Sequence, residues 1–144
     1  GSMIRTADAF AFNGFLVTAD TVWPMNPKVI RAAMGSCFHL PIISFHDIAA
    51  AADWLAGGSI PLLAADPHSE RSVATLVPGG RALVIGNEAH GLSEQARSLA
   101  RETVRIPMPG QSESLNAAAA TAIFAYELMK KRQQEALQEF NSHS

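Results

Sequence analysis

Residues 82–126 contain two short apolar runs, and each run ends at a turn that leads into a helix-forming sequence. The first run, 82–85, stops at Gly86 and is followed by the polar stretch 87–91. The second run, 103–106, stops at a proline and glycine loop, 107–110, ahead of an alanine-rich helix. In an open α/β sheet, ligands bind outside the carboxyl ends of the strands. The block therefore predicts two strand ends that together form the floor of a ligand pocket.

The rest of the chain alternates in the same way. Apolar runs that predict strands lie at 15–18, 40–44 and 60–65. Segments that predict helices lie at 4–10, 26–35 and 47–55. Asn13 and Gly14 can end the first of these helices, and Gly57 with Gly58 can end the third. Strands that alternate with helices indicate an α/β fold, a mainly parallel sheet with helices on both faces.

The last helix is predicted from about 114 to 132 or beyond. Its small-residue run, 117–120, is compatible with close helix packing, either within the chain or between two chains. The helix carries an apolar stripe spaced for one helical face, made of Leu115, Ala118, Ala119, Ala122, Ile123, Tyr126 and Met129.

Composition limits the class of protein. With 48% hydrophobic and 17% charged residues, the 144-residue chain can bury the core of one domain. No apolar run approaches the roughly 18 residues of a membrane span. The one cysteine, Cys37, excludes an intrachain disulfide, and the histidines show no metal spacing. We therefore expect a cytoplasmic protein without a metal, in which residues 1–3 are a cloning remnant and 4–144 form the domain.

The two turns of the central block also resemble known motifs. The sequence G-N-E-A-H-G at 86–91, followed by I-P-M-P-G at 106–110 and S-L-N at 114–116, is similar to the second and third motifs of the SpoU-type RNA 2′-O-ribose methyltransferases, members of the SPOUT superfamily. Residues 4–10, with Arg-Thr-Ala, resemble the close of the first motif. The asparagine, the glycine and the strand at the front of that motif are absent, which implies an N-terminally truncated domain.

This resemblance implies a fold with a C-terminal trefoil knot and a homodimer formed through the last helix. It implies methyl transfer from S-adenosyl-L-methionine to a ribose 2′-hydroxyl of tRNA or rRNA. The residues that it implies for the reaction are Arg5, Glu88, Ser114 and Asn116. Those that it implies for holding the cofactor are Leu63, Gly86, Asn87, Gly91, Ile106, Met108, Ser114 and Leu115.

Residue types alone allow simpler roles for these positions. Ile106 and Leu115 can pack in a core, and Ser114 and Asn116 can cap the last helix. Without the resemblance, Arg5 would be read as a surface arginine, and 87–88 as a solvated turn.

The alternative function is a truncated or degenerate methyltransferase domain that dimerises, and binds cofactor, without catalysis. The missing front of the first motif is the reason for it. A net charge of −2 is also unusual for a domain that binds RNA by itself, although basic residues gather at 97–105 and 130–132. An ordinary nucleotide-binding Rossmann domain ranks last, because no G-x-G-x-x-G follows a first strand.

Overall fold

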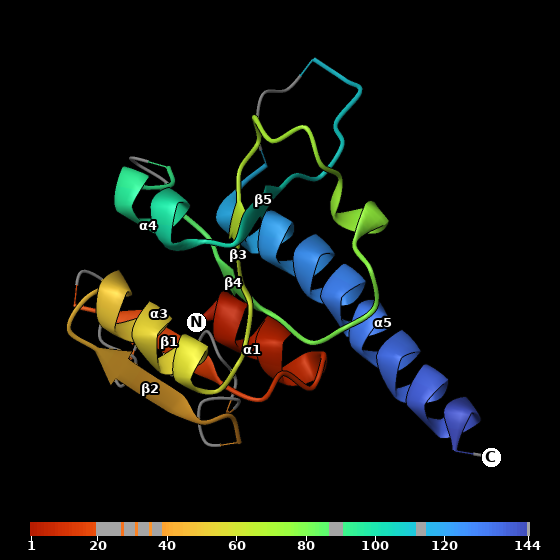
Figure 1. The fold of residues 1–144 in the computed structure, drawn as a ribbon. Helices are drawn as coiled ribbons and strands as arrows, with labels where there is room; N and C mark the ends of the chain where they lie inside the picture. The colour runs from red at the N-terminus through yellow and green to blue at the C-terminus, as the bar shows by residue number, and fades with distance from the viewer. Residues whose placement is uncertain are drawn as a thin grey trace.

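The computed structural model describes residues 1–19, 27, 31, 35, 39–86, 91–111 and 115–143. Short strands alternate with helices along the chain (Figure 1). The helices are α1 (Ser2–Ala9), α3 (Ile48–Gly57), α4 (Glu94–Leu99) and α5 (Ala117–Ser142), with a short 3₁₀ helix η2 (Val73–Thr75). The strands are β1 (Phe15–Thr18), β2 (Ile42–Phe45), β3 (Leu62–Ala65), β4 (Ala82–Val84) and β5 (Glu102–Val104).

Every pairing between these strands is parallel. β1 pairs with β2, with Phe15 opposite Ile42, and the other sheet has the order β4-β3-β5. The predicted parallel α/β fold is therefore confirmed, although the described strands form two sheets rather than one. The trefoil knot stays a prediction, because residues 112–114, which lead into α5, lie outside the described residues. The predicted helix 26–35 also falls largely outside them.

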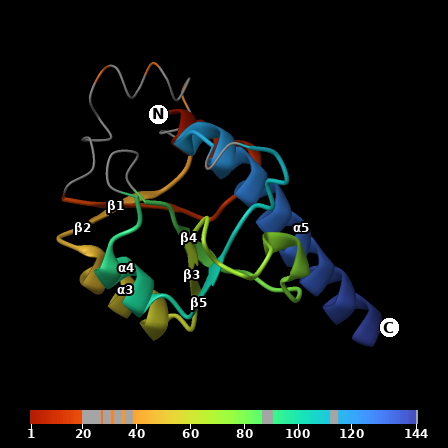
Figure 2. The same cartoon turned by 90° about the horizontal axis from the view of Figure 1, so that it is seen from above.

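Helices cover both faces of the strands. α1 and α5 pack against each other, and so do α3 and α4. α3 also contacts β1 and β2, and α4 contacts β3. Figure 2 shows the strands between these two pairs of helices. None of the helices that the structure describes has the length and hydropathy of a membrane span.

The larger core cluster lies between β3, β5 and α5. Leu63 and Val104 are fully buried, and Phe124 and Leu128 of α5 pack against them. Burying a side chain of this size contributes about 1.5–3 kcal/mol relative to leaving it exposed. A second cluster joins α1 to the loop before β2 through Ile4, Ala7 and Leu40. The first cluster holds the strand ends of the predicted pocket in place.

Side-chain caps explain where three helices begin. The carboxylate of Asp47 accepts a hydrogen bond from the N–H of Ala50 at 2.9 Å, at the start of α3. Ser93 caps α4 in the same way. Asn116 caps α5, its Oδ1 accepting from the N–H of Ala119 at 2.8 Å. Each cap satisfies a backbone donor that the first turn of a helix leaves without a partner.

The first helix ends close to residue 10, as predicted, but not at the predicted stop signal. α1 stops at Ala9 rather than at Asn13. Ala11 has a positive φ of 56°, and its N–H donates to the carbonyl of Asp8 while the N–H of Phe12 donates to the carbonyl of Ala7. This is the Schellman pattern, in which the left-handed residue is usually glycine. Its occurrence at an alanine is why the sequence pointed to the wrong stop.

The last helix is longer than the predicted minimum and buries a different face. Its buried residues are Thr121, Phe124, Ala125 and Leu128, which are not those of the predicted stripe. Within that stripe, Ile123 is 39% exposed and Tyr126 is 48% exposed. The helix therefore has two apolar faces, and the periodicity identified the one that is less buried within the chain.

Candidate functional site

The two predicted strand ends lie at one edge of the sheet, on either side of β3. Ala64 of β3 is level with Val84, the last residue of β4, and Ala65 is level with Val104, the last residue of β5. Because neighbouring strands are about 4.8 Å apart, the ends of β4 and β5 are separated by about 10 Å. The turns that follow them leave the sheet at its carboxyl edge, as the sequence predicted.

The turn after β4 is closed by a contact that only glycine allows. A Cβ added to Gly86 would lie 2.4 Å from the carbonyl carbon of Gly91 and 2.4 Å from the amide nitrogen of Leu92. Gly91 itself has a φ of +65°, a left-handed conformation that glycine adopts without strain. Both glycines are therefore needed to shape this turn, whether or not a ligand binds beside it.

The loop after β5 leaves main-chain groups open. Ile106 packs against the core, and Met108 is half-buried. Within the described part of the chain, the N–H groups of Met108, Gly110 and Gln111 take part in no hydrogen bond. A ligand beside this loop can therefore bond to backbone donors without breaking any bond that the protein already makes. This observation fits a cofactor held chiefly by main-chain atoms.

The remaining predicted cofactor residues, together with Glu88, which was predicted for the reaction, divide into three groups. Leu115 precedes the capped start of α5, and its side chain is 39% exposed. Leu63 is fully buried in the core, so the structure gives it a packing role and does not test its contact with a cofactor. Three predicted residues lie outside the described residues, namely Asn87, Glu88 and Ser114.

Arg5 lies on α1, with its side chain exposed. Ile4 and Ala7 of the same helix are buried, at 3% and 8% exposed, so the helix is anchored by them and presents Arg5 to solvent. No hydrogen bond or ion pair engages the guanidinium of Arg5 in the part of the chain that the structure describes. It is therefore available to an anionic ligand.

These features can be compared with those of known proteins. Residues 1–126 match the model of the SpoU rRNA methylase family. The chain belongs to that family. The 23S rRNA (uridine(2479)-2′-O)-methyltransferase of Streptomyces viridochromogenes is 37% identical over 138 residues, which cover 92% of this chain and 48% of that relative. The chain thus spans about half the length of the curated relatives that it matches first.

Solved SpoU structures superpose closely on the fold. The SpoU methyltransferase AviRb from Streptomyces viridochromogenes, in complex with the cofactor AdoMet, has a TM-score of 0.85 and 34% identity over 92% of this chain and 55% of that chain. A structure described as giving insight into the 2-OH methylation of C/U34 on tRNA has a TM-score of 0.80 and 29% identity, and the match covers 92% of this chain and 87% of that one.

The SpoU domain also has a charged cluster that the sequence did not predict. Asp66 follows β3 at the same carboxyl edge and is 5% exposed. Its Oδ1 accepts a hydrogen bond from the N–H of His68 at 2.9 Å, and its Oδ2 lies 3.3 Å from Nη1 of Arg97. In the sequence, an aspartate directly after an apolar strand was the feature that could have indicated this cluster. The pair ties α4 to the loop that leaves β3.

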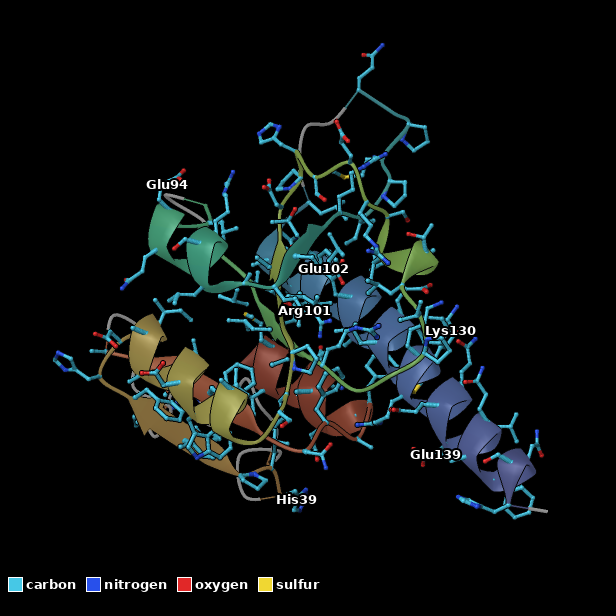
Figure 3. The ribbon with its side chains drawn as sticks, in the orientation of Figure 1. His39, Glu94, Arg101, Glu102, Lys130 and Glu139 are labelled. Carbon is cyan, nitrogen blue, oxygen red and sulfur yellow. The ribbon has the colours of Figure 1, made fainter. Side chains whose placement is uncertain are left out.

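An open hollow of about 530 Å³ surrounds this pair. Across it, Nη1 of Arg71 donates to Oε2 of Glu102 at 2.6 Å. Burial lowers the pKa of Arg81 nearby, an effect that the negative charge of Glu102 opposes. Figure 3 shows Arg101 and Glu102 together at the start of β5. Positively and negatively charged side chains are thus mixed in this hollow. This arrangement is better suited to stabilising the loops than to binding an anionic ligand.

The two basic groups noted in the sequence are largely engaged within the SpoU domain. Arg97 pairs with Asp66, and Lys130 pairs with Glu127 at 3.2 Å. Lys131 donates to the carbonyl of Ala74 at 3.1 Å. These contacts favour structural roles for much of the positive charge. Among the described residues, no group of three or more histidine, cysteine, aspartate or glutamate side chains could hold a metal ion.

Proposed function

We propose that this chain transfers a methyl group from S-adenosyl-L-methionine to a ribose 2′-hydroxyl of tRNA or rRNA. The observation that carries the proposal is the family match over residues 1–126, which includes both turns at the carboxyl edge of the sheet. A related SpoU structure holds AdoMet, and one relative is a 23S rRNA 2′-O-methyltransferase. An RNA substrate of this kind also implies a cytoplasmic location.

The cofactor would lie between the two turns, against the backbone of 106–111 and beside the turn that Gly86 closes. When bound, S-adenosyl-L-methionine supplies the sulfonium methyl group. The main-chain N–H groups after β5 would hold its polar atoms, and Leu115 would cover an apolar part. Asn87 and Ser114 would complete the pocket, while Leu63 would support its floor from the core.

Arg5 would hold the substrate rather than take its proton. A guanidinium stays protonated at neutral pH, so it is a poor general base. Its five N–H donors can bind a substrate phosphate and orient the ribose, with the phosphate oxygen then close enough to accept the hydroxyl proton. Glu88, Ser114 and Asn116 would order the RNA-facing side of the pocket. In Asn116, Oδ1 already serves the helix cap, which leaves its Nδ2 donor for this task.

Two measurements test this function. Calorimetric titration with S-adenosylhomocysteine should show binding, and transfer of a labelled methyl group should be found with either tRNA or rRNA as the acceptor. Arg5→Ala should abolish transfer and leave the affinity for S-adenosylhomocysteine unchanged, because the residue contacts RNA and not cofactor. An absence of cofactor binding would contradict the proposal. Binding without transfer to either RNA would instead support the degenerate domain.

We also infer that the chain forms a homodimer through the open apolar face of α5. Leu115, Ile123 and Tyr126 on this face are 39%, 39% and 48% exposed, and Leu137, further along the same face, is 60% exposed. Burying such side chains against a second copy would remove apolar surface from water. Light scattering should give a dimer for the wild type and a monomer for Ile123→Glu. Gln138→Glu, an exposed position on a different face of α5, is the matched control.

A further inference from the structure

Arg132 joins the middle of α5 to the end of α1, more than a hundred residues earlier in the chain. Its Nη1 donates to the carbonyl of Ala11 at 2.9 Å and to Oδ1 of Asn13 at 3.3 Å. Its Nη2 donates to the carbonyl of Phe10 at 3.1 Å. The guanidinium also lies 5.7 Å from the centroid of the Phe12 ring. One side chain thus contacts four consecutive residues.

Those four residues form the turn that ends α1. The carbonyls of Phe10 and Ala11 follow the last helical residue, and the turn depends on the positive φ of Ala11, which an alanine adopts only with strain. A positive charge at the C-terminal end of a helix also interacts favourably with the helix dipole. The planar guanidinium can serve two carbonyls at once, which the ammonium of a lysine cannot do with the same geometry.

Aromatic contacts support the same junction. The rings of Phe10 and Tyr126 meet edge to face, with their centroids 6.0 Å apart. Nζ of Lys130 lies 4.9 Å from the centroid of the Tyr126 ring. Figure 1 shows α1 lying against α5, and Figure 3 places Lys130 on α5. The end of α1 is therefore held by side chains from nearly two turns of α5.

This junction joins the two helices that carry parts of the proposed site. α1 carries Arg5, and α5 begins at its cap Asn116, beside Leu115. α1 and α5 pack against each other, so their contact sets the position of Arg5 relative to the start of α5. Arg132 also lies beyond residue 126, where the match to the family model ends.

We propose that Arg132 is a positioning residue for methyl transfer: by fastening the end of α1 to α5, it fixes Arg5 relative to the proposed pocket. The inference rests on the proposed function. A displacement of about 1 Å in a group that orients substrate can lower a rate by about 100-fold. The loss of Arg132 should therefore act on turnover with RNA while leaving the cofactor pocket, formed by other residues, intact.

The test compares Arg132→Ala, Arg132→Lys and the wild type, with Gln134→Ala as the control on an exposed position of the same helix. Arg132→Ala should lower kcat by about 10- to 100-fold and leave the Kd for S-adenosylhomocysteine within about twofold. Arg132→Lys should have a kcat between those of Arg132→Ala and the wild type. Lysine keeps the positive charge but lacks the planar guanidinium that serves two carbonyls at once. A role in stability alone predicts instead that the folded fraction of Arg132→Ala keeps the wild-type kcat, and that result would overturn the proposal.

Hydrogen exchange gives a readout that needs no activity. The amides of Ala11 and Phe12 are bonded within the turn, so their exchange should accelerate at least tenfold in Arg132→Ala and remain unchanged in Gln134→Ala. Unchanged exchange would show that Arg132 does not hold α1. A wild type that transfers methyl groups, together with a fully active Arg132→Ala, would refute the positioning role and leave the proposed function standing. An inactive wild type would remove both.

Discussion

Replacing Gly86 by alanine should destabilise the protein by about 2–3 kcal/mol, in the upper part of the range for overpacked sites. The new Cβ would lie 2.4 Å from the carbonyl carbon of Gly91 and 2.6 Å from its oxygen. These are backbone atoms, which cannot rotate away as the end of a flexible side chain can. Either Gly86 or the 91–92 backbone must therefore move, and the turn beside the proposed pocket must open.

Urea unfolding measures the effect directly. With a slope of about 2 kcal/mol per molar urea, the expected loss lowers the midpoint by about 1–1.5 M. Gly80→Ala is the matched control, because a Cβ at Gly80 meets nothing within 4 Å, and its stability should stay within about 0.5 kcal/mol of the wild type. Gly86→Ala should also weaken the binding of S-adenosylhomocysteine. Equal midpoints for the two variants would refute the packing argument.

Substitutions at three further positions test separate parts of the structure by the same unfolding assay. Asn116→Ala removes the cap of α5 and should cost about 1 kcal/mol, whereas Asn116→Ser, which can still cap, should cost much less. Asp66→Ala leaves the N–H of His68 and the side chain of Arg97 without their acceptor and should cost about 1–3 kcal/mol. Asp66→Asn keeps an acceptor oxygen, so its loss of stability should be smaller. An equal loss in the two variants would show that packing, and not these contacts, accounts for the effect. Leu63→Ala opens a cavity in the core and should cost about 2–5 kcal/mol, and a smaller loss would mean that the core collapses around it.

Local sequence predicted most of the elements of this fold, because helices and strands are specified by nearby residues. The helix predicted at 47–55, with the glycines 57–58 at its end, is α3, and the apolar runs at 15–18 and 60–65 contain β1 and β3. The motifs at 86–91 and 106–116 led to the right family, because each is a short pattern of residues that the chemistry of the site requires at one kind of turn.

Tertiary structure decided the features that depend on which surfaces meet. β3 separates the two predicted strand ends, α5 buries Phe124 and Leu128 instead of the predicted stripe, and α1 ends at a left-handed alanine. The pairs Asp66 with Arg97 and Arg132 with Ala11 join residues far apart in the sequence. Periodicity shows that a helix has an apolar face, but only packing selects which of two such faces is buried. A charged side chain likewise has many potential partners along the chain, and the folded backbone decides which of them come within bonding distance.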